Sequence, residues 1–340
     1  MQIGERIGLV GTLITERMGW KMKILITSRL PQEVIGILEQ GHDVVAYGEV
    51  RPMERQNLLH SVGGKEGLLC TITDRIDKEL LDRGPQLRMI ANFGVGFDNI
   101  DVEAATARGI PVSNTPGVLT DATADLTFAL ILVTARRVVE GDKRTRAGKF
   151  RFFAPLNFLG SEVSGKTLGI IGLGRIGKAV ARRARGFDMK VFYHSRRRIE
   201  TAEEEALGAT YKDLSTLLAR SDFVSLHVPL SEKTHHLIGR EEMKTMKPSA
   251  FLINTSRGPV VDEQALVEAL REGTIAGAGL DVYEEEPLLR PGLAELDNAV
   301  LLPHLGSATV ETRTRMGLKA AENLLAGLKG DKPPNCLNWH

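Results

Sequence analysis

The sequence predicts an α/β protein with two doubly wound parallel-sheet domains, and three observations support this fold class. Its 340 residues correspond to two domains at about 150 residues each. Hydrophobic residues make up 42% and charged residues 26% of the chain, as in ordinary globular proteins. Short apolar runs alternate with segments of helical periodicity, which is typical of parallel sheets covered by helices on both faces.

Five apolar runs predict the strands of the first half. They cover residues 23–27, 43–47, 67–72, 88–93 and 110–114. Between the first two, residues 31–40 have helical spacing, with a proline in the first turn, where a missing amide is tolerated. Residues 1–22 lack the basic start and cleavage pattern of a signal peptide, so we expect them to be an N-terminal extension.

A single long helix over residues 121–147 is predicted to separate the two series of strands. The strands of the second series are expected at residues 167–174, 190–195, 222–229, 250–256, 276–283 and 300–304. Residues 309–330 have the pattern of a strong helix that ends in glycine. This order predicts a second doubly wound sheet.

Composition excludes several classes of protein. The 44 basic and 43 acidic residues nearly balance, which argues against a nucleic-acid-binding or membrane-surface protein. No apolar run approaches the roughly 18 residues of a membrane span. The two cysteines, Cys70 and Cys336, are too few for a disulfide scaffold and too far apart for a metal knuckle. We therefore expect a cytoplasmic protein with no metal site.

A glycine-rich turn, GLGRIG, lies between a predicted strand and a predicted helix. In that setting Gly172 makes the tight turn, Gly174 lets the backbone approach a pyrophosphate, and Gly177 lets the helix pack closely against the strand. The helix N-terminus adds amide donors and a positive dipole end. The turn predicts a dinucleotide-binding Rossmann domain, although such turns also occur with a purely structural role.

The end of the next strand indicates which dinucleotide binds. An acidic residue there accepts the ribose hydroxyls of NAD in many such domains. This chain instead has Ser195 followed by Arg196 and Arg197. A hydroxyl and arginines suit a 2′-phosphate, so the pattern favours NADP over NAD. The alternative is a solvated basic loop that binds nothing.

Three ionisable residues stand at or just beyond the ends of later strands: Arg257, Glu286 and His304. A cation, a carboxylate and an imidazole can orient a carboxylate substrate and transfer a proton. Taken singly, each has a structural alternative, such as a solvated arginine or a hydrogen-bonded histidine. His227 illustrates the difficulty, because it also ends a strand but has no motif around it.

The motifs GLGRIG, NTSRG, DVYEEEP and PHLGSAT, in this order, resemble the D-isomer-specific 2-hydroxyacid dehydrogenase family. The resemblance covers residues 23–335 and is greatest to its glyoxylate/hydroxypyruvate reductases, notably over GLLCTITDRID and the sequence from PHLGSAT onward. It implies hydride transfer between a nicotinamide cofactor and short 2-keto acids, with glyoxylate and hydroxypyruvate first. NADP is the expected cofactor, and NAD is the weaker alternative.

The resemblance also implies residue roles. Arg257 would clamp the substrate, His304 would be the general acid, and Glu286 would be its carboxylate partner. The amides of Val95 and Gly96 and the side chain of Leu69 would contact the substrate. Further cofactor contacts are implied for Thr123, Arg175, Ile176, Pro229, Thr234, Thr255, Ser256, Asp281 and Gly306.

The domain organisation that the resemblance implies is split. Residues 23–121 and 305–340 would form a flavodoxin-like substrate-binding domain, and residues 122–304 the NAD(P)-binding Rossmann domain, with an active-site cleft between them. Residues 122–160 resemble the family's dimerisation arm, which implies a homodimer. The aromatic residues Phe150, Phe152 and Phe153 either reach toward the partner's active site or pack in the interface.

This function has three alternatives. A phosphoglycerate dehydrogenase is possible, although its longer forms need a regulatory domain and only 36 residues follow His304. A formate dehydrogenase would be expected to have a glutamine paired with its histidine, whereas this chain has Glu286. A nucleotide-sensing corepressor on the same fold would bind partners without turnover, and the near-neutral charge disfavours it.

Overall fold

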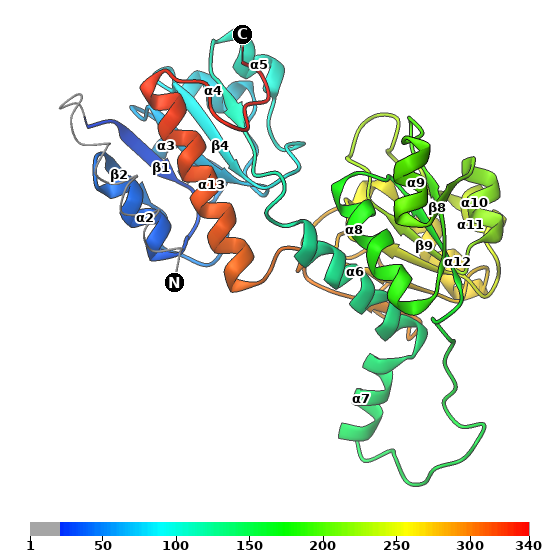
Figure 1. Cartoon of the computed structure of the whole chain (residues 1–340). Helices are drawn as coiled ribbons and strands as arrows, with labels where there is room; N and C mark the ends of the chain where they lie inside the picture. The colour runs from blue at the N-terminus through cyan, green and yellow to red at the C-terminus, as the bar shows by residue number, and fades with distance from the viewer. Residues whose placement is uncertain (1–20, 340) are drawn as a thin grey trace, which may run out of the picture. The chain divides into compact units, whose positions relative to one another are not determined.

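The computed structural model describes residues 21–339, which form two compact units (Figure 1). Unit 1 contains the described parts of Met1–Val118 and Val310–His340, and unit 2 is Leu119–Thr309. The predicted N-terminal extension lies outside the described residues, except for Lys21 and Met22.

Unit 1 is built on a five-stranded sheet in the order β2-β1-β3-β4-β5, with every pair parallel. The strands are β1 (Lys23–Ile26), β2 (Asp43–Ala46), β3 (Gly67–Thr71), β4 (Met89–Phe93) and β5 (Val112–Ser113). Its helices are α2 (Gln32–Glu39), α3 (Arg55–Ser61), α4 (Lys78–Arg83), α5 (Val102–Ala107) and α13 (Val310–Lys329).

Alternate side chains of these strands pack on opposite faces of the sheet, as the two-residue period of a strand requires. Ile24 and Leu69 pack with α2 and α13 on one face, whereas Leu25 and Leu68 pack with α3, α4 and α5 on the other. Helix α13 thus returns the end of the chain to the first sheet (Figure 1).

Unit 2 contains a seven-stranded parallel sheet in the order β12-β11-β10-β9-β6-β7-β8. The strands are β6 (Thr167–Ile171), β7 (Lys190–His194), β8 (Ala209–Tyr211), β9 (Phe223–Leu226), β10 (Phe251–Asn254), β11 (Gly277–Leu280) and β12 (Ala299–Leu301). The helices are α6 (Thr120–Ala135), α7 (Val138–Arg146), α8 (Arg175–Ala184), α9 (Thr201–Leu207), α10 (Leu214–Arg220), α11 (Arg240–Thr245) and α12 (Glu263–Glu272).

Helices cover both faces of this sheet as well. One hydrophobic cluster joins α6, α8 and α9 to the sheet, and the other joins α10, α11 and α12 to it. The prediction of two doubly wound parallel-sheet α/β domains is therefore confirmed.

The prediction of a single helix over residues 121–147 is wrong. The helix stops at Ala135, and a new one begins at Val138 after Arg137, whose φ of 52° is left-handed. Helix α6 belongs to the core, with Leu130 and Ile131 fully buried, so this part of residues 122–160 is no exposed arm. Helix α7 has no buried residue and projects from the rest of unit 2 (Figure 1). We call residues 138–160 the arm.

Strand β8, at the edge of the second sheet, is not among the predicted strands. Ala209–Tyr211 is only three residues long and pairs with β7 alone. Such a short run has too few residues to show an alternating pattern.

Candidate active site

The glycine-rich turn follows β6 directly and leads into α8. Gly172 has a φ of +97°, and a β-carbon there would lie 2.5 Å from the carbonyl oxygen of His227. A β-carbon on Gly177 would lie 2.2 Å from the carbonyl oxygen of Gly172. Gly174, the N-cap of α8, makes no side-chain capping bond and has open space around its Cα. The first turn of α8 therefore has uncapped amides next to the open space at Gly174.

Three consecutive arginines, residues 196–198, lie just beyond β7 and differ in their interaction partners. Arg198 forms a two-point ion pair with Glu204 at 2.7 and 2.8 Å, and the Tyr193 hydroxyl donates to the same carboxylate at 2.6 Å. The hydrogen bond from Arg198 lowers the pKa of Glu204 to about 2. Arg196 and Arg197 are exposed and have no ion-pair partner among residues 21–339.

Ser195 lies between this group and the strand. Its hydroxyl oxygen is buried and has no hydrogen-bond partner within the described part of the chain. A buried hydroxyl without a partner is costly, and such groups commonly mark a place where a ligand or water binds.

Other predicted cofactor-binding residues are hydrogen-bonded to one another within unit 2. The Thr234 hydroxyl donates to the carbonyl of Pro229 at 2.7 Å, and the Thr123 hydroxyl donates to the carbonyl of Gly306 at 3.0 Å. Of the other predicted cofactor contacts, Arg175 and Ile176 lie in the first turn of α8. Thr255 is hydrogen-bonded to Thr127, and Ser256 is hydrogen-bonded to Asn254.

His304 and Glu286 form a direct pair. Nδ1 of His304 lies 2.8 Å from Oε2 of Glu286, and the side chains are 30% and 34% exposed. Burial raises the pKa of Glu286, but the hydrogen bond and charge of His304, together with the Tyr283 amide and the charge of Arg257, lower it below its usual range. Glu286 is thus ionised at neutral pH and can hold a protonated imidazole.

Arg257 is brought to this pair by backbone packing. It directly follows the Asn254–Ser256 turn at the end of β10, and Gly258 comes next. A β-carbon on Gly258 would lie 1.8 Å from the carbonyl carbon of Tyr283. Only glycine allows the Arg257 loop to lie against the backbone of the loop that carries Glu286.

Asp281 holds the loop that carries His304. Its carboxylate accepts the amides of Leu305 at 2.6 Å and Gly306 at 2.7 Å, and its carbonyl accepts the amide of His304 at 3.0 Å. His304 has a left-handed φ of 54°, which is unusual for a residue with a side chain and is maintained here by these contacts. No motif in the sequence indicates this anchoring function of Asp281.

His227 is a structural residue. It is hydrogen-bonded to Ser225 at 2.8 Å, and desolvation of the imidazole lowers its pKa to about 3. The imidazole is therefore neutral at physiological pH.

In unit 1, Val95 and Gly96 lie in the loop that follows β4. Leu69 requires a correction. Its side chain has no exposed surface and packs in the core beneath α2 and α13, because it is on the face of β3 that these helices cover. In this structure the Leu69 side chain therefore has no free surface with which to contact a substrate.

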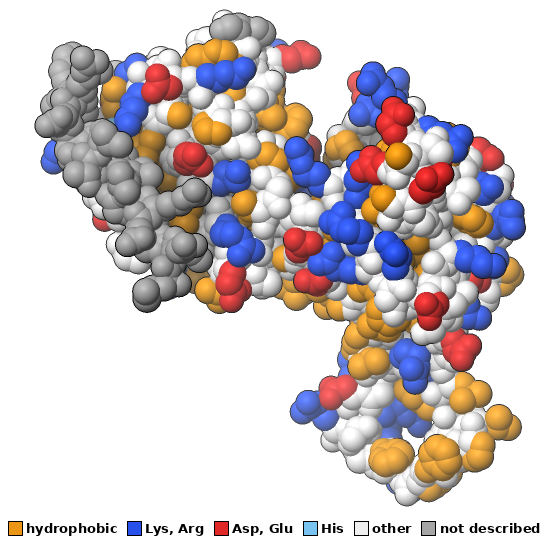
Figure 2. All heavy atoms as spheres, viewed as in Figure 1, with side chains coloured by type: hydrophobic (Ala, Val, Ile, Leu, Met, Phe, Trp, Pro, Cys, Tyr) orange, Lys and Arg blue, Asp and Glu red, His pale blue; other side chains and the backbone are white. Residues whose placement is uncertain are grey.

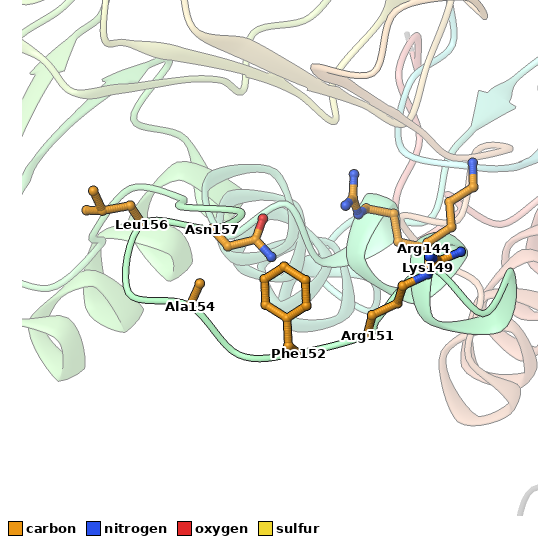
Figure 3. A pocket seen from close by; sticks show the side chains of 7 residues that line it. All are labelled: Arg144, Lys149, Arg151, Phe152, Ala154, Leu156 and Asn157. Carbon is orange, nitrogen blue, oxygen red and sulfur yellow. The ribbon is translucent and has the colours of Figure 1, made fainter.

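Figure 3 shows a cavity of about 510 Å³ on the arm, and neither His304 nor Glu286 is among its lining residues. It is lined by Arg144, Lys149, Arg151, Phe152, Ala154, Leu156 and Asn157. Among residues 21–339, no group of three or more histidine, cysteine, aspartate or glutamate side chains could hold a metal ion. Over the same range, no helix is long and apolar enough to cross a membrane.

Comparison with known proteins agrees with this geometry. Residues 128–306 match the model of the D-isomer specific 2-hydroxyacid dehydrogenase, NAD binding domain. The glyoxylate reductase of Thermococcus litoralis is 53% identical over 322 residues, which are 94% of this chain and 97% of that protein. The chain belongs to the D-isomer specific 2-hydroxyacid dehydrogenase family.

Solved structures resemble this dehydrogenase closely. A glyoxylate reductase from Paecilomyes thermophila has a TM-score of 0.84 and 34% identity, covering 93% of this chain and 98% of that one. The NADPH-dependent glyoxylate/hydroxypyruvate reductase of Sinorhizobium meliloti, solved with NADP and malonate, has a TM-score of 0.82 and 34% identity over 94% and 97% of the two chains.

The NAD-binding domain of this dehydrogenase has the features that a dinucleotide needs. The uncapped first turn of α8 can receive a pyrophosphate, because amides and the positive dipole end meet where Gly174 leaves the backbone open. The unpaired Ser195 hydroxyl lies one strand away at the end of β7. These residues fit a nicotinamide dinucleotide.

Proposed function

We propose that this dehydrogenase reduces short 2-keto acids, glyoxylate first and hydroxypyruvate second, with NADPH preferred to NADH. The observation that carries the proposal is the His304–Glu286 pair with Arg257 nearby, in the same unit as the glycine-rich turn. The relatives named glyoxylate reductase support the choice of substrate.

Each member of the group has a distinct chemical role in this proposal. His304, protonated and held by the Glu286 carboxylate, gives its proton to the oxygen of the keto group as that oxygen becomes an alkoxide. Arg257 orients the substrate carboxylate through its planar guanidinium and stabilises negative charge on the reacting oxygen. The amides of Val95 and Gly96, in unit 1, are further proposed substrate contacts. The nicotinamide cofactor supplies the hydride when bound.

The cofactor would be held by residues at the carboxyl ends of the strands of unit 2. The turn from Gly172 to Gly177 would hold the pyrophosphate, and Ser195, Arg196 and Arg197 the adenosine ribose and its 2′-phosphate. Proposed contacts along the rest of the cofactor come from Thr123, Arg175, Ile176, Pro229, Thr234, Thr255, Ser256, Asp281 and Gly306. Asp281 would act mainly through the loop that it anchors.

The purified chain is expected to reduce glyoxylate with a kcat/KM roughly 10- to 100-fold higher with NADPH than with NADH. One charge-assisted hydrogen bond from Arg196 or Arg197 to a 2′-phosphate accounts for this range. The measurement is the steady-state rate with each cofactor on a panel of keto acids. An absence of turnover with both glyoxylate and hydroxypyruvate contradicts the proposed activity, and a cofactor ratio at or below one contradicts the preference.

The double variant Ser195→Asp, Arg196→Ala tests the same residues, because it places a carboxylate where a 2′-phosphate would bind. It should reverse the preference while kcat with the better cofactor stays similar. Arg182→Ala is the matched control, since Arg182 is an exposed arginine near the other end of α8. It should leave the ratio unchanged.

We also propose that the arm makes the enzyme a homodimer. Hydrophobic side chains gather on the arm (Figure 2), and Phe153 and Leu156 are each 86% exposed. Light scattering should give twice the mass of the chain, and Phe153→Glu should give a monomer. Val50→Glu, at an 85% exposed position of unit 1, is the control that should remain dimeric. A monomeric unmodified chain would disprove the proposal.

The proposed location is the cytoplasm. Cys70 and Cys336 are both free thiols, which suits a reducing compartment. Fractionation of cells tests this, and recovery of the activity outside the cytoplasmic fraction would contradict it.

A further inference from the structure

Three buried asparagine side chains are concentrated in unit 1. Asn92 on β4, Asn114 just after β5 and Asn323 on α13 are 0%, 8% and 0% exposed. Burying an amide is costly unless its donors are paired, and a hydrophobic side chain would fill the same space without that cost. Each of the three donates to a backbone carbonyl, so their presence requires an explanation in terms of what they hold.

Two of these side chains converge on the loop after β4. Nδ2 of Asn92 donates to the carbonyl of Gly96 at 2.7 Å, and Nδ2 of Asn114 donates to the carbonyl of Val95 at 2.7 Å. The backbone amide of Thr115 donates to the carbonyl of Gly94 at 2.9 Å. Three consecutive carbonyls of this loop are thereby fixed by buried donors.

This arrangement determines where the amides of the loop point. In a trans peptide the C=O of one residue and the N–H of the next point in opposite directions. Because the carbonyls of residues 94–96 are held by interior donors, the amides of Val95, Gly96 and Phe97 are turned away from those donors. None of these three amides has an acceptor among residues 21–339. Successive amides directed to one side form a site for an anion.

A second tier of bonds holds Asn114 itself. Nδ2 of Asn323 donates to the Asn114 carbonyl at 3.1 Å, and the Asn114 amide donates to the Asn335 carbonyl at 3.3 Å. Oδ1 of Asn323 accepts the amide of Asn335 at 3.0 Å. Asn323 and Asn114 therefore connect the C-terminal segment to the loop after β4.

We propose that Asn92 and Asn114 are positioning residues for the substrate, which hold the amides of Val95, Gly96 and Phe97 as a binding site for its carboxylate. Asn323 and Asn335 support Asn114 in this arrangement. The proposal rests on the proposed function for the identity of the anion, and it adds Phe97 and the asparagines to the residues that determine carboxylate binding.

The test is Asn114→Ala in the full chain. KM for glyoxylate should rise roughly tenfold while kcat stays within about twofold, because binding is lost equally in the ground state and the transition state. Asn114→Asp keeps the side-chain volume but loses the donor, and it should show the same split if the alanine variant does not fold. A loss of stability alone would lower the yield of folded enzyme without changing KM.

Asn298→Ala is the matched control. Nδ2 of Asn298 also donates to two backbone carbonyls, those of Leu270 at 3.1 Å and Ala276 at 3.3 Å, but it lies in unit 2 just before β12. This variant should leave KM for glyoxylate unchanged. An equal KM in Asn114→Ala and the unmodified enzyme, or an equal rise in Asn298→Ala, would overturn the proposal.

Oxalate separates this inference from the proposed function, because it presents carboxylates but has no keto group to reduce. Its affinity, measured by calorimetry with NADPH present, should fall roughly tenfold in Asn114→Ala. An unmodified chain that binds oxalate but does not reduce glyoxylate contradicts the proposed function only. Equal oxalate affinity in the unmodified chain and both Asn114 variants contradicts the positioning role only.

Discussion

His304→Ala should lower kcat for glyoxylate reduction by ~10²–10⁴, the usual contribution of a positioned general acid. The affinity for NADPH, measured by fluorescence titration, should stay nearly the same, because the loop amides that Asp281 fixes do not depend on the imidazole. Near-normal turnover across neutral pH would show that another group donates the proton.

Glu286→Gln is the companion variant, and its effect is measured from the pH dependence of kcat/KM. The lowered pKa of Glu286 keeps the carboxylate charged through the neutral range and down to acid pH, where protonation would break the pair. Removing this charge destabilises the imidazolium, so the alkaline limb of kcat/KM should move to lower pH. An unchanged limb would mean that Glu286 is not the electrostatic partner of His304.

Arg257→Lys should raise KM for glyoxylate and also lower kcat, with kcat/KM falling roughly 100-fold. A lysine retains the charge but has no planar fork, so it loses the two-point contact that orients a carboxylate and the donor aimed at the reacting oxygen. Two charge-assisted hydrogen bonds, at about 1.5 kcal/mol each, correspond to a loss of this order. Steady-state kinetics at saturating NADPH measures both parameters.

Arg290→Lys is the control for Arg257. Arg290 follows Glu286 in the same loop region and pairs with Glu284 at 2.9 Å, so the substitution also removes a guanidinium from this part of the unit. It should leave KM nearly unchanged. If Arg257→Lys behaves like Arg290→Lys, Arg257 is a structural loop residue.

The sequence by itself determined the fold class and the positions of most strands. Buried parallel strands are continuous apolar runs, and residues such as 24–26 or 168–171 carry this signal without reference to the rest of the chain. The glycine-rich turn could also be recognised locally, because its steric requirements lie within six residues and the strand beside them. Ser195, Arg257, Glu286 and His304 could be named as candidates for the same reason, since each stands at or beyond a strand end in a recognisable motif.

Tertiary structure decided what depends on partners distant in the chain. Arg198 is the third arginine of a run, and only its contacts with the Glu204 and Tyr193 pair show that it is bound within the protein. Arg196 and Arg197 have no ion-pair partner in the described part of the chain. Leu69 proved to be a core residue because α13, more than 240 positions later, covers its face of the sheet.

The proposed role of Asn114 depends on its hydrogen bonds to Val95 on one side and Asn323 on the other. Strand and turn patterns depend on neighbouring residues, so the sequence records them directly. Hydrogen bonds between residues that are 19 or 209 positions apart form only when the chain is folded, and no local pattern encodes them.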